Sequence, residues 1–300
     1  MTKPIERREF IRNSVIMAGA LAAGGPLRVL ARTAAQAGPP DIASVRAESA
    51  QKMVSEALRL LGGINRFVGR GDKVVILPNP QGNRPGVSTN GEVIREVIRQ
   101  CLNAGAAEVS VSSIHSQGRW YSSGIQDAIE TSGAKIQFPR GGADWAEVDL
   151  PKSKILKKAR IVRKAIECDA LINVPVFKQH DAAEVTGCLK NLMGFYSNCN
   201  YFHSGGDAFL HQAIADLASA FSPKLLIVDA IQILADNGPF GPGRILSPKR
   251  VLAGTDMVAM DAFCCGLLRK NPGDVGHIVE SGEAGLGVSD VTKLNVLETG

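Results

Sequence analysis

The chain has 300 residues, of which 21% are charged and 45% are hydrophobic, and its formal net charge is +5. Six of its 34 Lys and Arg residues, but only two of its 29 Asp and Glu residues, fall within positions 1–37, which leaves 28 basic and 27 acidic side chains in the rest. This near-neutral remainder argues against nucleic acid or an anionic membrane surface as a partner, because both need a basic stripe. No segment after Gly38 is long and apolar enough to predict a transmembrane helix.

Residues 1–37 have the pattern of an export signal. The stretch Glu6-Arg7-Arg8-Glu9-Phe10-Ile11-Arg12 resembles the twin-arginine consensus, an apolar stretch follows over 15–25, and Ala35-Gln36-Ala37 places small residues at a cleavage site. We therefore expect the twin-arginine export machinery to carry the chain to the periplasm, with cleavage near Ala37 and a linker over 38–45. The alternative is an uncleaved N-terminus that anchors the chain to a membrane.

Helix and strand patterns alternate after the linker. Apolar residues at helical spacing predict a helix over 44–61, and the buried run over 73–77 predicts a strand. A helix over 91–103 and a strand over 108–112 complete a βαβ unit. The same reasoning predicts helices over 125–132, 185–193, 208–220 and 256–268, strands over 135–138, 170–174, 224–229 and 250–253, a helix or a strand leading into one over 154–168, and an edge strand over 294–297.

This order of elements predicts an α/β fold with a parallel or mostly parallel sheet flanked by helices. It leaves open whether residues 46–300 form one domain or two lobes, 46–168 and 169–300. Ligands of such sheets bind at the carboxyl ends of the strands. Polar residues gather at those predicted ends: the 79–89 loop, His115, Lys178, His180, Asp229 and Asp256. Asp256 is also expected to cap the helix that follows it.

The densest group of chemically versatile side chains comprises Lys178, His180, Lys190 and His203, with His211 close behind. Histidine can act as an acid, a base or a metal ligand near neutral pH. A lysine in a partly buried cleft can lose its charge, act as a nucleophile or bind an anion. Each residue taken singly is also consistent with a solvated or structural side chain, but the grouping at predicted strand ends indicates a site.

The loop over 79–89 leads into a predicted helix N-terminus. Its Arg84, Ser88 and Thr89 suit a phosphate or a carboxylate. The Walker A spacing is absent, and no GxGxxG follows a strand, which argues against a P-loop and a nicotinamide Rossmann site. A plain solvated loop is the alternative. A second Gly- and Pro-rich loop, Asp236–Gly243, is either a lid over the site or a rigid turn.

The chain has six cysteines and no CxxC pair, so a ribbon-type zinc site or a ferredoxin-type cluster has no motif support. Buried free thiols are the favoured interpretation. Disulfides, which an oxidising compartment permits, and a metal or cluster site remain alternatives. The cysteines are Cys101, Cys168, Cys188, Cys199, Cys264 and Cys265.

Several segments together resemble the DUF362 family over about residues 70–270. They are Ile76–Asn79, Thr89–Ile98, Lys178–His180, Thr186–Gly194, His203, Ile227–Ile231, Gly238–Gly241 and Gly254–Asp261. The most specific is Thr186–Gly194, which contains Leu-Lys-Asn-Leu-Met-Gly. The family name records a largely unassigned function, and some members are fused to ferredoxin-type cluster domains.

The order of His115, His180, Lys190 and His203 also resembles the site of the lactate racemase family. In that family a lysine holds a nickel-pincer nucleotide covalently, a histidine ligates nickel, and two histidines exchange a proton or hydride equivalent with the substrate. The resemblance implies Lys190 as the attachment site, His203 as the metal ligand, and His115 and His180 as the acid–base pair. The cofactor stays unidentified, with nickel or iron as the candidate metal.

The predicted site therefore groups His115, His180 and Lys178 as catalytic residues. It groups Lys190, Asn191, Arg84, Ser88 and Thr89 as cofactor-binding residues. The leading hypothesis is an exported enzyme or cofactor-bearing redox protein that acts on a small anionic molecule. The alternatives are a non-catalytic extracytoplasmic binding protein for a small anion or metal, and an accessory subunit that meets a redox partner protein.

Overall fold

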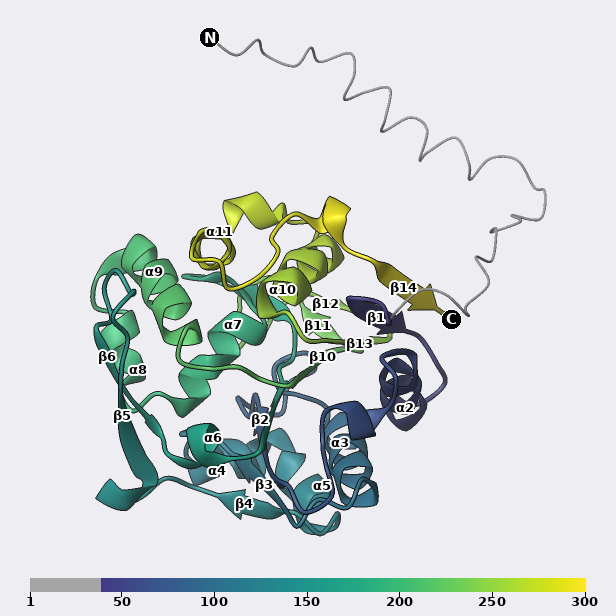
Figure 1. Cartoon of the computed structure of the whole chain (residues 1–300). Helices are drawn as coiled ribbons and strands as arrows, with labels where there is room; N and C mark the ends of the chain where they lie inside the picture. The colour runs from purple at the N-terminus through teal and green to yellow at the C-terminus, as the bar shows by residue number, and fades with distance from the viewer. Residues whose placement is uncertain (1–38) are drawn as a thin grey trace, which may run out of the picture. The chain divides into compact units, whose positions relative to one another are not determined.

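Short aliphatic runs of the chain form one eight-stranded sheet with the strand order β14-β1-β13-β10-β7-β2-β3-β4 (Figure 1). The computed structural model describes residues 39–300, so the predicted export signal and its cleavage site lie outside the described residues. The strands are β1 (Ile42–Val45), β2 (Lys73–Pro78), β3 (Glu108–Ser112), β4 (Lys135–Gln137), β7 (Ala170–Val174), β10 (Leu225–Ala230), β13 (Arg250–Gly254) and β14 (Val296–Thr299).

The sheet is mostly parallel, as the sequence predicts. Strands β4, β3, β2, β7 and β10 pair in parallel along one half of the sheet. Strand β13 runs antiparallel to both of its neighbours, β10 and β1, and the edge strand β14 is parallel to β1. The carboxyl ends of β2, β3, β7 and β10 therefore meet at one edge of the sheet, and the carboxyl end of β13 lies at the opposite edge.

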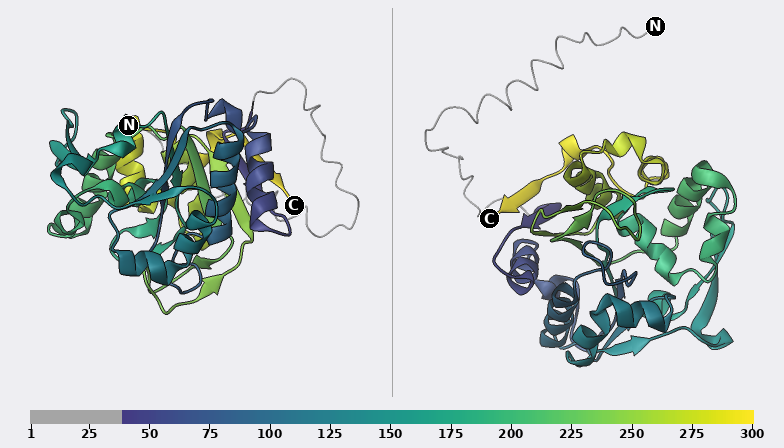
Figure 2. Two further views of the ribbon diagram at one scale, coloured as in Figure 1. Left: turned by 90° about the horizontal axis from the view of Figure 1, so that it is seen from below. Right: turned by 180° about the vertical axis from the view of Figure 1, so that it is seen from behind.

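Helices cover both faces of the sheet because successive strand residues point to opposite sides. Consecutive residues of β7 therefore belong to two separate hydrophobic cores: Leu171 packs in one and Ile172 in the other. The helices α2 (Ala50–Leu60), α3 (Gly91–Asn103) and α5 (Ile125–Glu130) cover one face. The helices α7 (Cys188–Asn191), α9 (Gly206–Ala218), α10 (Met257–Cys265) and α11 (Gly276–Glu283) cover the other (Figures 1 and 2).

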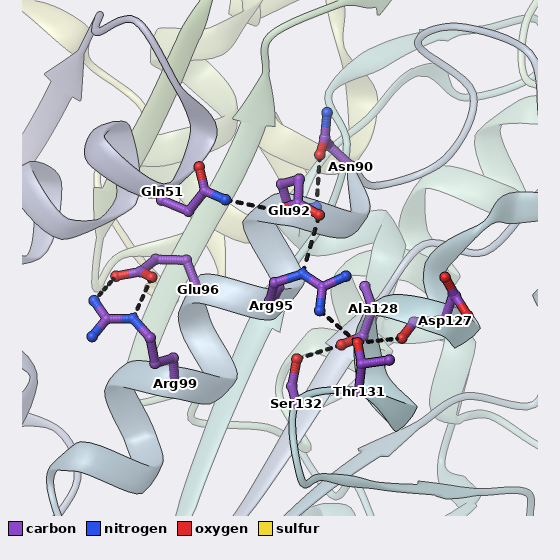
Figure 3. Close-up of polar contacts among 10 residues, drawn as sticks. All are labelled: Gln51, Asn90, Glu92, Arg95, Glu96, Arg99, Asp127, Ala128, Thr131 and Ser132. Atoms are coloured by element: carbon purple, nitrogen blue, oxygen red, sulfur yellow. Dashed lines mark hydrogen bonds and ion pairs between the residues drawn. The ribbon is translucent and has the colours of Figure 1, made fainter.

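Polar contacts join α2, α3 and α5 above their apolar faces (Figure 3). The Gln51 amide donates to Glu92 at 2.6 Å, and the Arg95 guanidinium donates to the Thr131 hydroxyl at 2.5 Å. Burial alone would raise the pKa of Glu96, but hydrogen bonds led by Arg99 lower it overall. These contacts hold α2, α3 and α5 together as one layer on this face of the sheet. The amino end of α3 in this layer follows the 79–89 loop.

The beginning of the described chain differs from the sequence prediction. The expected linker over 38–45 contains strand β1, and the helix expected over 44–61 begins at Ala50, after the N-cap Ser49. Strand β1 is only four residues long and pairs with β13 and β14, which lie at the far end of the chain. Its pairing partners, rather than any local pattern, therefore determine this strand.

The two lobes that the sequence left open share a single sheet. Strand β7 pairs with β2 and β10, so the sheet continues across the suggested boundary between 168 and 169. Residues 39–300 form one compact unit. Residues 39–300 are therefore one domain, with a layer of helices on each face of the sheet.

Smaller elements surround the carboxyl edge of the sheet. The predicted helix over 185–193 begins only at Cys188, because the preceding residues pair with β8 as strand β9. Within residues 39–300 no helix has the length and apolar character needed to cross a membrane. The smaller elements are α4 (Gln117–Ser123), α6 (Lys164–Glu167), α8 (Cys199–Phe202), β5 (Trp145–Asp149), β6 (Lys158–Val162), β8 (Lys178–His180), β9 (Glu184–Thr186), β11 (Ile233–Leu234) and β12 (Ile245–Leu246).

Candidate functional site

A cavity of about 580 Å³ opens beyond the carboxyl ends of β2, β3 and β7. This is the place where parallel α/β sheets hold their ligands, because the loops after adjacent strands converge there. The structure brings six of the nine predicted site residues into its wall. They are His115, Lys178, His180, Lys190, Asn191 and His203.

Lys178 lies at the floor of the cavity, in β8, and is 1% exposed. Its ammonium donates to the side-chain oxygen of Asn79 at 3.2 Å and to the carbonyl of Val87 at 2.6 Å. Both acceptors are neutral. Burial lowers the pKa of Lys178 to about 7, and the charges of Lys190 and Arg119 add to this effect. Lys178 is therefore a buried cation that is close to losing its proton.

Lys190 lies on the short helix α7 and is half-buried. The nearest polar contact of its ammonium is the thioether sulfur of Met193 at 3.6 Å, a weak acceptor. Burial lowers the pKa of Lys190 to about 8. Among residues 39–300, no carboxylate lies within ion-pair distance of Lys178 or Lys190. The cavity thus holds two ammonium groups without a counter-charge from the described chain.

His115 follows β3, and both of its ring nitrogens have partners. Nδ1 lies 2.5 Å from the hydroxyl of Ser113, and Nε2 lies 2.6 Å from the side-chain nitrogen of Gln81. Arg119 can only donate, so Gln81 presents its oxygen to Arg119 and its amide N–H to His115. The proton of neutral His115 is therefore on Nδ1, and Nε2 is an acceptor. Burial, together with nearby positive charges, lowers the pKa of His115 to about 3.

His180 and His203 face each other across the cavity wall, with ring centroids 6.4 Å apart and planes within 10°. The backbone N–H of Ala183 donates to Nδ1 of His180 at 3.2 Å, so the proton of neutral His180 is on Nε2. Burial and the charge of Lys190 lower the pKa of His180 to about 2. The same causes, burial first, lower the pKa of the exposed His203.

Asn191 joins the cavity to the core of the sheet. Its side-chain oxygen accepts a hydrogen bond from Asn79 at 2.9 Å, and its side-chain nitrogen donates to Asn173 at 2.8 Å. Asn173, the fourth residue of β7, donates in turn to the carbonyl of Cys188 at 2.8 Å. These three buried amides fix the angle at which α7 presents Lys190.

Asp261 fixes the amino end of α7 from below, a role that the sequence did not indicate. It is fully buried in α10 and accepts hydrogen bonds from the backbone N–H groups of Cys188 at 2.6 Å and Leu189 at 2.9 Å. Burial raises the pKa of Asp261 to about 7. A Cβ at Gly187 would lie 2.2 Å from Oδ1 of Asp261, so only glycine allows this approach. No pattern in the sequence reveals this role, because Gly187 and Asp261 are far apart in the chain and meet only in the fold.

The structure places the other three predicted cofactor-binding residues outside the main cavity, beside a smaller one of about 220 Å³. The Ser88 hydroxyl accepts from the backbone N–H of Gln81 at 2.8 Å, and the Thr89 hydroxyl accepts from that of Asn79 at 2.9 Å. Arg84 donates to backbone carbonyls of the 236–243 loop at 3.1 Å. All three side chains thus hold loops together where the sequence predicted an anion site.

The two acidic residues at predicted strand ends, Asp229 and Asp256, also lie outside the wall of the main cavity, as does His211. Asp229 is buried and accepts backbone hydrogen bonds from Asn90 at 2.7 Å and Ile231 at 3.0 Å. Asp256 follows the antiparallel strand β13 and therefore lies at the opposite edge of the sheet. It caps α10 as predicted, accepting from two backbone N–H groups at 2.8 and 2.9 Å. His211 stacks on the buried His277 with ring centroids 5.3 Å apart.

The Gly- and Pro-rich loop over 236–243 contributes Pro239 and Phe240 to the wall of the cavity. Its Phe240 lines the wall and packs beneath the guanidinium of Arg119, 5.0 Å from the ring centroid. The backbone N–H of Gly238 donates to the side chain of Gln179 at 2.6 Å, and a Cβ at Gly238 would lie 1.8 Å from the Gln179 carbonyl oxygen. Sequence reasoning missed Arg119, because its helix α4 has no distinctive pattern.

All six cysteines are free thiols, which agrees with the favoured interpretation. Four are buried, and Cys168 and Cys199 are partly buried. Burial raises the pKa of Cys199, although the charges of Lys190 and Arg119 oppose this shift. Cys199 lines the cavity and donates to the Met193 carbonyl at 3.3 Å, so its thiol is part of the wall.

The donor set does not fit a nickel or iron ion held by protein side chains alone. Within residues 39–300, no three His, Cys, Asp or Glu side chains gather as a metal site would require. His203, the predicted metal ligand, is exposed at the cavity mouth and has a stacked imidazole, His180, as its neighbour. A metal here would need most of its ligands from another molecule.

The fold and the cavity define an α/β protein with a cationic, histidine-lined pocket at the carboxyl edge of a mostly parallel sheet. The chain belongs to the family described as "Domain of unknown function (DUF362)", whose model matches residues 74–266. This confirms the family expected from the motifs.

The chain is also similar to two proteins of known sequence or structure. The "Thylakoid-associated protein sll1697" of Synechocystis sp. is 27% identical over 243 residues, which cover 76% of this chain and 73% of that protein. The lactate racemase apoprotein from Thermoanaerobacterium thermosaccharolyticum aligns with 80% of this chain at 14% identity and a TM-score of 0.43. This chain covers 56% of the length of that structure.

Proposed function

We propose that this protein is an enzyme that binds a small anionic molecule in the cavity and exchanges a proton with it. The observation that carries the proposal is the pair of cavity ammonium groups, on Lys178 and Lys190, with no carboxylate partner among residues 39–300. Buried charges are ordinarily paired, because an unpaired one costs several kcal/mol of desolvation. An anionic ligand would supply the missing counter-charge.

The lysines and Arg119 would bind and orient the anion. Lys190 has only a thioether contact, so its N–H donors are available to a ligand oxygen. Lys178 keeps two neutral acceptors and has one further donor to offer. Arg119 lies exposed at the mouth and can attract the ligand before it enters. Phe240 and the 236–243 loop would limit water around the bound anion.

His115 and His180 have complementary protonation states. His115 presents Nε2 as an acceptor, whereas His180 carries its proton on Nε2 and is a donor. When the ligand takes the place of the Gln81 amide at Nε2 of His115, one neutral imidazole can take a proton from the ligand while the other gives one, as general acid–base catalysis requires. Burial is the main cause of the low pKa of both rings, and a bound anion would raise these values by offsetting the part that comes from nearby cations. His115 is accordingly the base and His180 the acid.

Anion affinity should depend on pH in a defined direction. The free protein has Lys178 with a pKa of about 7 and Lys190 with a pKa of about 8, and a bound anion raises both values. Binding above pH 7 must therefore be coupled to proton uptake, so affinity is greatest below pH 7 and falls as pH rises. We expect at least a tenfold loss, roughly, between pH 6.5 and 9.

Calorimetric titration with oxalate, which does not titrate in this range, measures that dependence. Repeating it in buffers of different ionisation enthalpy counts the protons taken up. A flat affinity profile with no proton uptake would show that these lysines do not contact the anion. Because this experiment measures only binding, its result does not depend on whether the protein has catalytic activity.

A non-catalytic binding protein is the second candidate, and one observation favours it. Imidazoles with a pKa near 2 or 3 are weak bases, so a ligand that left these values unchanged would meet no efficient proton acceptor. The anion-binding part of the proposal would then stand without the chemistry. Hydrogen exchange between a bound anion and solvent separates the two candidates.

Export to the periplasm is part of the same proposal, and it rests on the twin-arginine pattern at Arg7 and Arg8. Cell fractionation of the full chain and of its Arg7→Lys, Arg8→Lys double variant tests it. We expect the wild-type chain in the periplasmic fraction, shortened to begin near Gly38, and the variant retained at full length. Equal distribution of both chains would contradict export by this route.

A further inference from the structure

A directional chain of hydrogen bonds runs from the cavity to the far side of α7. The ammonium of Lys178 donates to Asn79 at 3.2 Å, Asn79 donates to Asn191 at 2.9 Å, and Asn191 donates to Asn173 at 2.8 Å. Asn173 donates to the carbonyl of Cys188 at 2.8 Å. The N–H of that same peptide, on Leu189, donates to Asp261 at 2.9 Å. Four amide groups therefore connect a buried ammonium to a buried carboxylate.

The two ends of the chain determine its direction. An ammonium can only donate and an ionised carboxylate can only accept, so every amide between them must point its oxygen toward Lys178. Reversing one asparagine would set two N–H groups or two oxygens against each other. Each asparagine in the chain is at most 4% exposed, so water cannot repair such a mismatch. The amide dipoles are thus aligned with their negative ends toward the ammonium.

We propose that Asp261 is a positioning residue for the cavity, whose carboxylate stabilises the ammonium of Lys178 remotely through the chain Asn79, Asn191 and Asn173. Aligned dipoles polarise one another, and their field acts strongly in a water-poor interior. Asp261 also caps α7 and so sets the direction of Lys190. One carboxylate outside the cavity therefore controls both of its lysines. The inference rests on the proposed function, since it names the control of that same site.

The test measures the titration of Lys178 without any ligand, so its failure is distinct from a failure of anion binding. Lysine labelled with 13C at Cε is observed by NMR in the full chain, and the Lys178→Met variant assigns the signal. We expect Asp261→Asn to lower the pKa of Lys178 by about one unit, because the substitution removes the negative end of the chain. Asn173→Leu cuts the chain in the middle and should lower it similarly.

Asp256→Asn is the matched control. Asp256 is the N-cap of α10, the helix that carries Asp261. It accepts hydrogen bonds from the backbone N–H groups of Val258 and Ala259, and it is neither in the cavity wall nor in the hydrogen-bond chain to Lys178. It should leave the pKa of Lys178 within about 0.3 unit of the wild-type value. An equal shift in the Asp256 and Asp261 variants, or full additivity of Asp261→Asn with Asn173→Leu, would overturn the proposal.

A reciprocal measurement covers the case in which Asp261→Asn does not fold. Coupling between two sites is symmetric, so removing the ammonium in Lys178→Met must raise the pKa of Asp261 by the same amount. The 13Cγ shift of Asp261, followed against pH in wild type and Lys178→Met, reports that value. An unchanged Asp261 titration would show that the chain carries no coupling.

Discussion

Replacing Lys190 with Met weakens oxalate binding at pH 7 by at least about 30-fold, the first of the two largest effects that we expect. The ammonium of Lys190 has only a weak thioether contact, whereas that of Lys178 has two oxygen acceptors, so a bound anion gains more from Lys190. Removing a charged partner from such a contact costs about 2 kcal/mol or more, which corresponds to this change in affinity. Met matches the length of the lysine stem and keeps its packing. Calorimetric titration measures the loss.

Lys135→Met is the control for this measurement. Lys135 lies exposed on β4, away from the cavity wall, and its substitution changes the net charge by the same amount. It should bind oxalate like the wild-type protein at physiological ionic strength. If both variants lost affinity equally, the anion would be responding to net charge. If Lys190→Met bound as tightly as wild type, the anion would not occupy this cavity.

Substituting either His115 or His180 by Gln should slow proton exchange on a bound substrate by about 100-fold or more, the usual contribution of general acid–base catalysis. His115 supplies the acceptor nitrogen and His180 the donor, so loss of either interrupts the transfer. The readout is the incorporation of solvent deuterium into a panel of small carboxylates, followed by NMR. Oxalate affinity should change by less than about threefold, because the lysines that bind the anion remain.

His211→Gln provides the matched substitution outside the cavity wall. His211 contacts His277 and not the cavity, so its variant should exchange deuterium at the wild-type rate. Wild-type protein that binds members of the panel without exchanging any hydrogen would favour the binding-protein alternative. Normal exchange in His115→Gln and His180→Gln would remove these residues from the chemistry while leaving the anion site intact.

Much of the site could be predicted because parallel strands bring their carboxyl ends to one edge. His115 and Lys178 each follow a strand of the parallel half, β3 and β7, so their meeting in one cavity follows from strand order alone. Asp256 shows the limit of the same argument. Its strand, β13, runs antiparallel, and no local feature of the sequence reveals strand direction. The residue therefore lies at the opposite edge.

Residues that act through other residues were not visible in the sequence. Arg84, Ser88 and Thr89 have side chains suited to an anion, and in the fold they line a separate, smaller cavity and make hydrogen bonds with backbone groups of neighbouring loops. Asp261 illustrates the reverse case. Its role depends on Cys188 and Leu189, which lie more than 70 positions earlier in the chain. The backbone N–H groups of these two residues donate hydrogen bonds to the Asp261 carboxylate.

The sequence by itself determined the α/β class, the main parallel strands, the family and the residues that could do chemistry, because these depend on local apolar periodicity and on short motifs. Only the tertiary structure decided that β1 belongs to the sheet, that β13 is reversed, and that two lysines share a cavity without a carboxylate partner in the described chain. Those features arise from pairings between distant segments, and burial then changes the pKa of each group that the pairings enclose.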